Sequence, residues 1–111
     1  MYQVGELELL VHNACSSTSG NSYFAQFGRL AHQRYMSNLA NGIDKVKEFI
    51  LPSGRRIDFI DTVNGFVYEL KPNNPRAIQR GYNQVSSYIA ELMSMPEFAH
   101  ITKWKGIIDV Y

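Results

Sequence analysis

Asp58, Glu69 and Lys71 are the residues whose types and spacing best support chemistry in this sequence. Glu69 and Lys71 are two positions apart in the run FVYELK, and side chains at that spacing in a strand point to the same face. Asp58 lies among apolar residues in the run RRIDFID, where an unpaired carboxylate is costly unless a cation meets it. Paired carboxylates supply the oxygen ligands that Mg²⁺ or Mn²⁺ prefer, and a nearby lysine can position water or stabilise a transition state. The residues therefore predict metal-assisted hydrolysis of a phosphodiester.

A structural interpretation of the same residues stands beside this one. Glu69 and Lys71 would form a solvated ion pair on an open sheet face, and Asp58 would pair with Arg55 or Arg56. Glu-x-Lys spacing is common in proteins, so the bare pattern favours this second interpretation. The elements around the residues have to decide between the two.

Length and composition set the bounds for those elements. The chain has 111 residues, 45% of them hydrophobic and 19% charged, which fits one compact domain. A formal net charge of +1 gives no global attraction to a polyanion, so any nucleic-acid footprint has to be a local patch. Cys15 is the single cysteine; it cannot form an internal disulfide, and its polar surroundings predict an exposed thiol. Neither a membrane-spanning run nor a signal-peptide pattern is present in the sequence.

Hydrophobic periodicity and turn signals predict the elements that position the site. Apolar residues at steps of three and four predict a first helix that ends before Gly42, and Asn74 and Pro75 are the cap and first residue expected of a second helix. Turn signals at Pro52-Ser53-Gly54 and Asn64-Gly65 join three strands into an antiparallel meander. The predicted elements are a helix over 22–40, strands over 45–51, 55–61 and 66–71, a helix over 75–93 and a strand over 104–111.

This order predicts an α/β fold of the α+β sandwich kind, with an α-β-β-β-α-β core and a central mixed sheet flanked by two helices. The second helix carries two distinct rows of side chains. Its apolar stripe consists of Ile78, Tyr82, Val85, Ile89 and Leu92. Arg76, Arg80, Gln84 and Tyr88 recur at steps of four and predict a local phosphate-binding patch, although a solvated helix face would show the same pattern.

The whole arrangement resembles the PD-(D/E)xK nuclease superfamily, whose restriction-endonuclease-like core has the Asp and the ExK motif on adjacent strands. The resemblance covers about residues 22–111. It implies that Asp58 and Glu69 are metal ligands, that Leu70 lends its backbone carbonyl, and that Lys71 is the catalytic lysine. Ile57 occupies the position of the proline in the family's name, an element that the superfamily often replaces.

Two further motifs resemble those of RecB-like nucleases. Gly28 to His32 matches a GxxxH pattern, and Gln84 to Tyr88 matches a QxxxY pattern. The likeness implies that His32 contributes to the metal site, which makes Zn²⁺ plausible beside Mg²⁺ or Mn²⁺. It also implies that Gln84 and Tyr88, together with Arg76 and Arg80, approach the nucleic-acid backbone. The alternatives are an ordinary helical histidine for His32 and helix-surface filling for Gln84 and Tyr88.

The amino-terminal run VGELELLVHNAC is similar to the end of the self-cleaving HINT or pretoxin modules of bacterial polymorphic toxins. In such modules the side chain of an asparagine, here Asn13, attacks its own carbonyl while a preceding histidine, here His12, donates a proton. We therefore predict that residues 1–21 are a remnant of an upstream module and a linker, and that residues 22–111 are the nuclease domain. The fragment lacks the rest of such a module and is not expected to cut itself; a plain polar loop is the alternative.

The run YELKPNNPRAIQRGYNQVSSY resembles the nuclease toxins at the C-terminal ends of polymorphic toxins. This likeness implies a metal-dependent DNase that is secreted or delivered from the producing bacterium and acts in the cytoplasm of the target cell. It also implies a cognate immunity protein as a partner. Two alternatives stay open: an RNase or structure-selective nuclease, and a non-catalytic module that binds nucleic acid or protein.

Overall fold

The structure is a computed structural model that describes residues 9–13 and 21–111, with side chains from residue 26 onward. Cys15 and most of the predicted linker lie outside these ranges. Within them, no helix has the length and apolar character needed to cross a membrane. The elements are β1 (Leu9–Asn13), α1 (Asn21–Arg34), β2 (Lys45–Ile50), β3 (Arg56–Asp61), β4 (Phe66–Lys71), α2 (Pro75–Met93), the 3-10 helix η1 (Pro96–Phe98) and β5 (Lys105–Val110).

The strands form one mixed sheet of five, in the order β1-β5-β4-β3-β2. β2, β3 and β4 are an antiparallel meander, because the two connections between them are tight turns. β5 returns parallel to β4 after the chain has crossed over through α2, so that Glu69 lies beside Ile108. The predicted α-β-β-β-α-β order and the mixed sheet are confirmed.

β1 adds a fifth strand to the predicted core. It pairs in parallel with β5, which places His12 beside Asp109 and Asn13 beside Val110. These residues belong to the segment predicted as a remnant of an upstream module, and their backbone extends the sheet at its edge. The boundary between such a remnant and the nuclease domain stays a prediction.

The turn between β3 and β4 requires its glycine for two reasons. Gly65 has φ of +78°, a left-handed conformation that glycine adopts at little cost. A Cβ atom at this position would also lie 2.7 Å from the carbonyl oxygen of Lys103. The predicted Asn64-Gly65 turn is thus confirmed, and it sets the register that brings Phe59 opposite Tyr68.

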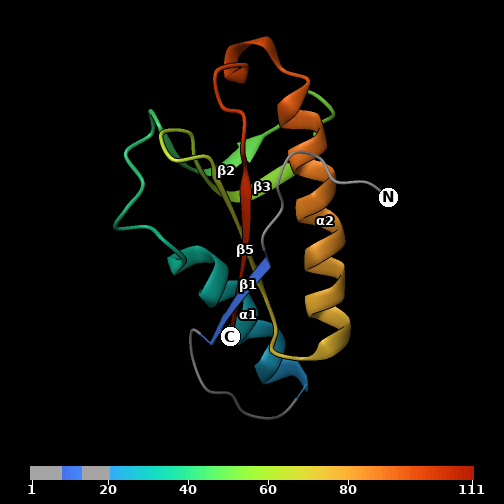
Figure 1. The fold of residues 1–111 in the computed structure, drawn as a ribbon. Coiled ribbons are helices and arrows are strands. Elements are labelled where there is room, and N and C mark those ends of the chain that lie inside the picture. The colour runs from blue at the N-terminus through green and yellow to red at the C-terminus, as the bar shows by residue number, and fades with distance from the viewer. Residues whose placement is uncertain (1–8, 14–20) are drawn as a thin grey trace.

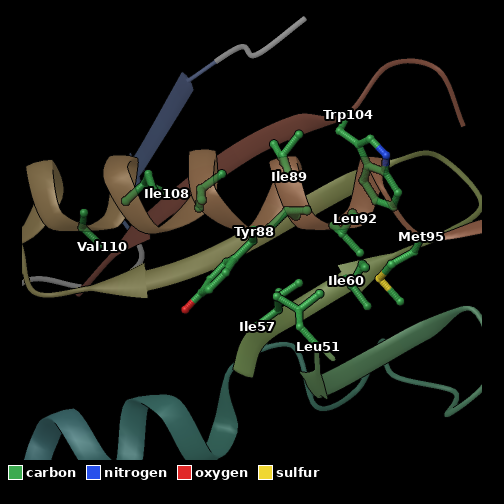
Figure 2. Close-up of a cluster of buried hydrophobic side chains, with 12 residues drawn as sticks. Leu51, Ile57, Ile60, Tyr88, Ile89, Leu92, Met95, Trp104, Ile108 and Val110 are labelled. Atoms are coloured by element: carbon green, nitrogen blue, oxygen red, sulfur yellow. The ribbon is translucent and has the colours of Figure 1, made fainter. Parts of the chain in front are cut away.

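α2 begins as its cap residues predict. The Asn74 side chain accepts a hydrogen bond of 2.8 Å from the backbone N–H of Ala77, and Pro75 follows as the first residue of the helix. Figure 1 shows α2 running alongside β5 and β4. Figure 2 shows the core between this helix and the sheet. Its buried residues are Leu51, Ile57, Ile60, Val67, Val85, Tyr88, Ile89, Leu92, Met95, Trp104, Ile108 and Val110.

α1 ends at Arg34, so the prediction that it continues to about residue 40 is wrong. Lys47 of β2 ends it, because its ammonium donates to the carbonyls of His32 and Gln33 at 3.1 and 2.9 Å. Met36 then takes a left-handed conformation with φ of +56°. The helix lies near the C-terminal end of β5, where the chain end is marked in Figure 1.

Candidate active site

Asp58 lies where β3 and β4 separate. The recorded pairing of these strands runs from Asp61 with Phe66 to Phe59 with Tyr68. At the next position the Asp58 carboxylate accepts a hydrogen bond from the backbone N–H of Leu70, with 2.8 Å between Oδ2 and N. The Leu70 N–H thus donates to a side chain of β3 instead of to a backbone carbonyl of that strand. This hydrogen bond holds the Asp58 carboxylate in the opening between the strands.

Glu69 and Lys71 are an ion pair, but not a solvated one. Lys71 Nζ lies 3.4 Å from Glu69 Oε2, and the two side chains are 16% and 5% exposed. The other carboxylate oxygen, Glu69 Oε1, is buried and has no hydrogen-bond partner among the described residues. Gly81 of α2 lets the helix approach closely here, because a Cβ atom there would lie 3.0 Å from Lys71 Cγ. The interpretation of this pair as an open surface feature is therefore wrong.

Burial and neighbouring charges shift the pKa values of Glu69 and Asp58. The pKa of Glu69 is raised to about 8, mainly by burial and also by the charge of Asp58, against the lowering effects of Lys71 and of the Asp58 backbone N–H. Burial also raises the pKa of Asp58, against the lowering effects of the Leu70 N–H and His32. Burial therefore favours the protonated, neutral form of both carboxyl groups, and so does the proximity of two like charges.

The residues fit a hard divalent cation. In a strand, alternate carbonyls point to opposite sides, and the Lys71 carbonyl accepts from the Tyr111 N–H on the β5 side at 3.0 Å. The Leu70 carbonyl therefore faces β3, as does its N–H. Asp58, the unpartnered oxygen of Glu69 and this carbonyl are oxygen donors of the kind that Mg²⁺ uses together with waters.

Zn²⁺ fits this site less well. Its sites use three or four nitrogen, sulfur or carboxylate ligands. In the part of the chain whose side chains are described, no group of three or more His, Cys, Asp or Glu residues could hold a metal ion. His32 lies beside Asp58 instead, with 3.6 Å between its Nδ1 and Asp58 Oδ2, and its side chain is 42% exposed.

Packing explains the spacing of Gly28 and His32. A Cβ atom at Gly28 would lie 2.6 Å from the hydroxyl of Tyr111, so glycine lets this residue approach α1. One turn later His32 meets the same ring edge-on, with 6.1 Å between centroids. Tyr111 thus sets the distance of α1 from the sheet, and His32 reaches Asp58 as a result.

The polar row predicted on α2 does not lie on one surface. Steps of four along a helix of 3.6 residues per turn drift, by about a third of a turn between Arg76 and Tyr88. Arg76 and Arg80 are exposed, whereas Tyr88 is buried in the core and the Gln84 Oε1 is buried with no partner in the described chain. Helix-surface filling is therefore wrong for Tyr88, and its hydroxyl points away from α2 in Figure 2.

Tyr88 is close enough to Glu69 and Asp58 to be affected by their charges. Burial raises its pKa to about 12, with further contributions from the charges of Glu69 and Asp58. The guanidinium of Arg55 lies 5.2 Å from the ring centroid and pairs with Glu91 at 3.1 Å. Arg56 pairs with Glu48, at 3.3 Å, so the alternative in which Asp58 pairs with Arg55 or Arg56 is wrong.

Further residues near the site carried no signal in the sequence. Tyr35 donates a hydrogen bond of 2.5 Å to Asp109 Oδ2, a contact between residues 74 positions apart that holds the end of α1 to β5. Glu48 has a left-handed φ of +55° within β2, and its charge raises the pKa of Asp58. Only the backbone strain at Glu48 marks it as unusual, and strain of this kind is invisible in a sequence.

A protein-family model matches the part of the chain that contains this site. The model of the family described as restriction endonuclease fold toxin 9 matches residues 20–111. The match spans α1 to β5 and so includes each site residue described above. Comparisons with curated proteins and with solved structures give no match.

Proposed function

The chain belongs to the restriction endonuclease fold toxin 9 family and is a nuclease toxin, and we propose that it is a metal-dependent DNase. The observation that carries this proposal is the buried, unpartnered Oε1 of Glu69 beside Asp58 and Lys71. A carboxylate oxygen in that position is costly unless a cation binds it. Structural ion pairs rarely leave such an oxygen unsatisfied, whereas a metal site needs one.

Asp58, Glu69 and the Leu70 carbonyl would hold Mg²⁺ or Mn²⁺. The cation would polarise the scissile phosphate and lower the pKa of a bound water. Asp58 is oriented for this role by the Leu70 N–H, which occupies one lone pair of Oδ2 and leaves the rest of the carboxylate available. Glu69 is oriented by Lys71 through Oε2, which leaves Oε1 available.

Lys71 has a second task in this proposal. Its ammonium is mostly buried, so its charge is weakly screened by water and acts strongly on groups close to it. From there it can orient the water that attacks in line at phosphorus and stabilise the charge that develops on the phosphate oxygens. His32, at the outer side of Asp58, would serve as an additional ligand or as a charge partner of that carboxylate.

Nucleic acid would be held by α2 and the groups beneath it. Arg76 and Arg80 are exposed and can contact backbone phosphates, which fixes the position of a strand without reading its sequence. Gln84 and Tyr88 lie further along the helix, on the part of its surface that faces the carboxylates. They would contact the sugar-phosphate closest to the cut. This division of roles replaces the single surface row.

The biological setting that we propose is delivery into a rival cell. The protein would be secreted or delivered from its producer, would act in the cytoplasm of the target cell, and would be neutralised in the producer by a cognate immunity protein. The family's description as a toxin supports this setting. Cleavage after Asn13, assisted by His12 within a complete upstream module, would release the nuclease domain.

Digestion of plasmid DNA and of total RNA tests the proposal. Wild type and Asp58→Ala are incubated with chelator, Mg²⁺, Mn²⁺ or Zn²⁺, with Glu97→Ala as a control because Glu97 is an exposed carboxylate in η1. We expect cleavage of DNA with Mg²⁺ or Mn²⁺ by the wild type and the control alone. Cleavage of RNA only would support the RNase alternative. Toxicity that survives in Glu69→Gln and Lys71→Ala would support the non-catalytic module.

A further inference from the structure

A cavity of about 820 Å³ opens between α1 and β2, and its lining includes His32, the neighbour of Asp58. This volume lies within the range of about 300 to 1,000 Å³ that is usual for sites of small ligands. Its walls carry the side chains of Gln26, Arg29, Leu30, His32, Gln33, Glu48 and Tyr111. The family match and the PD-(D/E)xK motif assign no role to this cavity.

The cavity lies beside the proposed position of the scissile phosphate. His32 lines it and also lies 3.6 Å from Asp58, the carboxylate proposed to bind the cation. Glu48 also lines the cavity, and its charge raises the pKa of Asp58. A phosphate held at Asp58 and Glu69 would therefore place the next part of the same nucleotide at the mouth of the cavity.

The lining suits a nucleobase better than it suits a second phosphate. The amides of Gln26 and Gln33 can each donate and accept hydrogen bonds, as base edges require. The Glu48 carboxylate repels phosphate but accepts from a base amino group. His32 and Arg29 offer planar groups on which a base can stack. Leu30 and the ring of Tyr111 add apolar surface, against which the face of a base can pack.

We propose that this cavity binds the base of the nucleotide next to the cut, and that the substrate is accordingly unpaired at that nucleotide. A base inside a duplex is stacked and paired, and has to leave the stack before it can enter a pocket. Single strands, frayed ends and flaps present such a base without that cost. This inference rests on the proposed nuclease function and specifies the form of nucleic acid that it acts on.

Binding of oligonucleotides that lack one base tests the proposal. Fluorescence anisotropy is measured with the whole chain, with Ca²⁺ as the oxygen-binding cation, on a labelled single strand and on versions with one abasic site moved along it. At one position we expect the abasic strand to bind about tenfold more weakly, in line with the stacking and hydrogen bonds of one base. The same sequence closed into a hairpin duplex should also bind at least tenfold more weakly than the single strand.

Variants connect that loss to the cavity. Gln33→Ala should bind the intact strand about fivefold more weakly than the wild type, and should lose little more with the abasic strand, because both changes remove the same contact. Thr102→Ala, at an exposed position outside both α2 and the cavity, is the control and should behave as the wild type. Equal binding of intact and abasic strands, equal effects of the Gln33 and Thr102 variants, or duplex binding as tight as single-strand binding would each overturn the proposal.

These outcomes are separate from those of the nuclease proposal. The binding measurement does not depend on cleavage, so a protein that binds as expected but cuts nothing would refute the catalytic assignment and leave the base pocket standing. A protein that cuts DNA but binds intact and abasic strands alike would refute only the pocket. Binding of the cavity face to an immunity protein with no effect of Gln33→Ala on nucleic acid would assign the face to that partner instead.

Discussion

The Asp58 carboxylate and the backbone N–H of Leu70 are joined by a hydrogen bond of 2.8 Å across the point where β3 and β4 separate. This bond ties the charge of the site to the local shape of the sheet. Asp58 accepts this hydrogen bond in the fold, and the proposed chemistry also requires its negative charge. The two requirements can be separated by substitution.

Asp58→Asn is expected to keep the fold and lose activity. The Asn oxygen can still accept from Leu70, whereas Asp58→Ala leaves this buried donor without a partner and should cost about 1–3 kcal/mol of stability. Both variants should lower the cleavage rate by about a hundredfold or more, because a charged ligand of the site is gone. Chemical unfolding and plasmid cleavage measure the two effects. Equal stability of Asn and Ala variants would contradict the structural role of the bond.

The raised pKa of Glu69 predicts that the metal-free protein loses stability as pH rises. Its pKa moves from the ordinary 4.5 to about 8 on folding, so between these values the folded state holds a proton that the unfolded state has released. The contribution is fully present below pH 4.5 and is lost as pH rises through about 8. Thermal unfolding in chelator should show this decline, and Glu69→Gln should flatten it.

Added Mg²⁺ supplies the control for that measurement. A cation that binds the ionised carboxylates of the folded state stabilises it by mass action, and most strongly at high pH where Glu69 has no proton to lose. The wild type should therefore regain stability with Mg²⁺ above pH 8, and Glu69→Gln should regain much less. An identical response of the two proteins would argue against Glu69 as a ligand.

Lys71→Met tests the buried ammonium without opening a cavity. Methionine keeps the unbranched stem that packs against Gly81 and removes the charge. We expect the rate of cleavage to fall by about a hundredfold to a thousandfold, as for other groups that stabilise a transition state. Lys103→Met, at an exposed position, should retain activity. Turnover measured at saturating substrate distinguishes this effect from weaker binding.

Gly28→Ala and Tyr111→Phe should compensate one another. The added Cβ would lie 2.6 Å from the Tyr111 hydroxyl but 3.4 Å from the nearest ring carbon, so removing the hydroxyl removes the clash. Gly28→Ala alone should push α1 away, destabilise the fold and weaken the activity that depends on His32. The double variant should recover most of both, and a full double-mutant cycle of stability and cleavage measures the coupling. Additive effects would show that the contact does not set the position of α1.

Two substitutions at Tyr88 distinguish a role in the core from a role in the site. Tyr88→Ala should destabilise the fold by about 3–5 kcal/mol, because the ring is buried against α2 and the sheet. Tyr88→Phe keeps the ring and should change stability little, while a hydroxyl that contacts the substrate would cost up to about tenfold in activity. Cleavage by Tyr88→Phe at the wild-type rate would confine this residue to the core.

Local signals in the sequence were enough to predict most of the secondary-structure elements that surround the site. The Asn64-Gly65 turn, the Asn74 cap and the alternation that places Glu69 and Lys71 on one face each depend on residues a few positions apart. Such features follow from backbone sterics and from hydrogen bonds within one turn, so the chain specifies them before it is folded. Local reasoning also singles out Asp58, from the cost of a carboxylate among apolar neighbours, and its role as a metal ligand stays a prediction.

Contacts between distant parts of the chain were decided only by the tertiary structure. Lys47 ends α1 early, Tyr111 sets its distance from the sheet, and Tyr88 turns inward because steps of four drift around a helix. The environment of Glu69 is of the same kind, since its raised pKa depends on burial under α2 and on the charge of Asp58 from another strand. Sequence determines the types of these side chains; their electrostatic state depends on which distant groups the fold brings beside them and how much water it excludes.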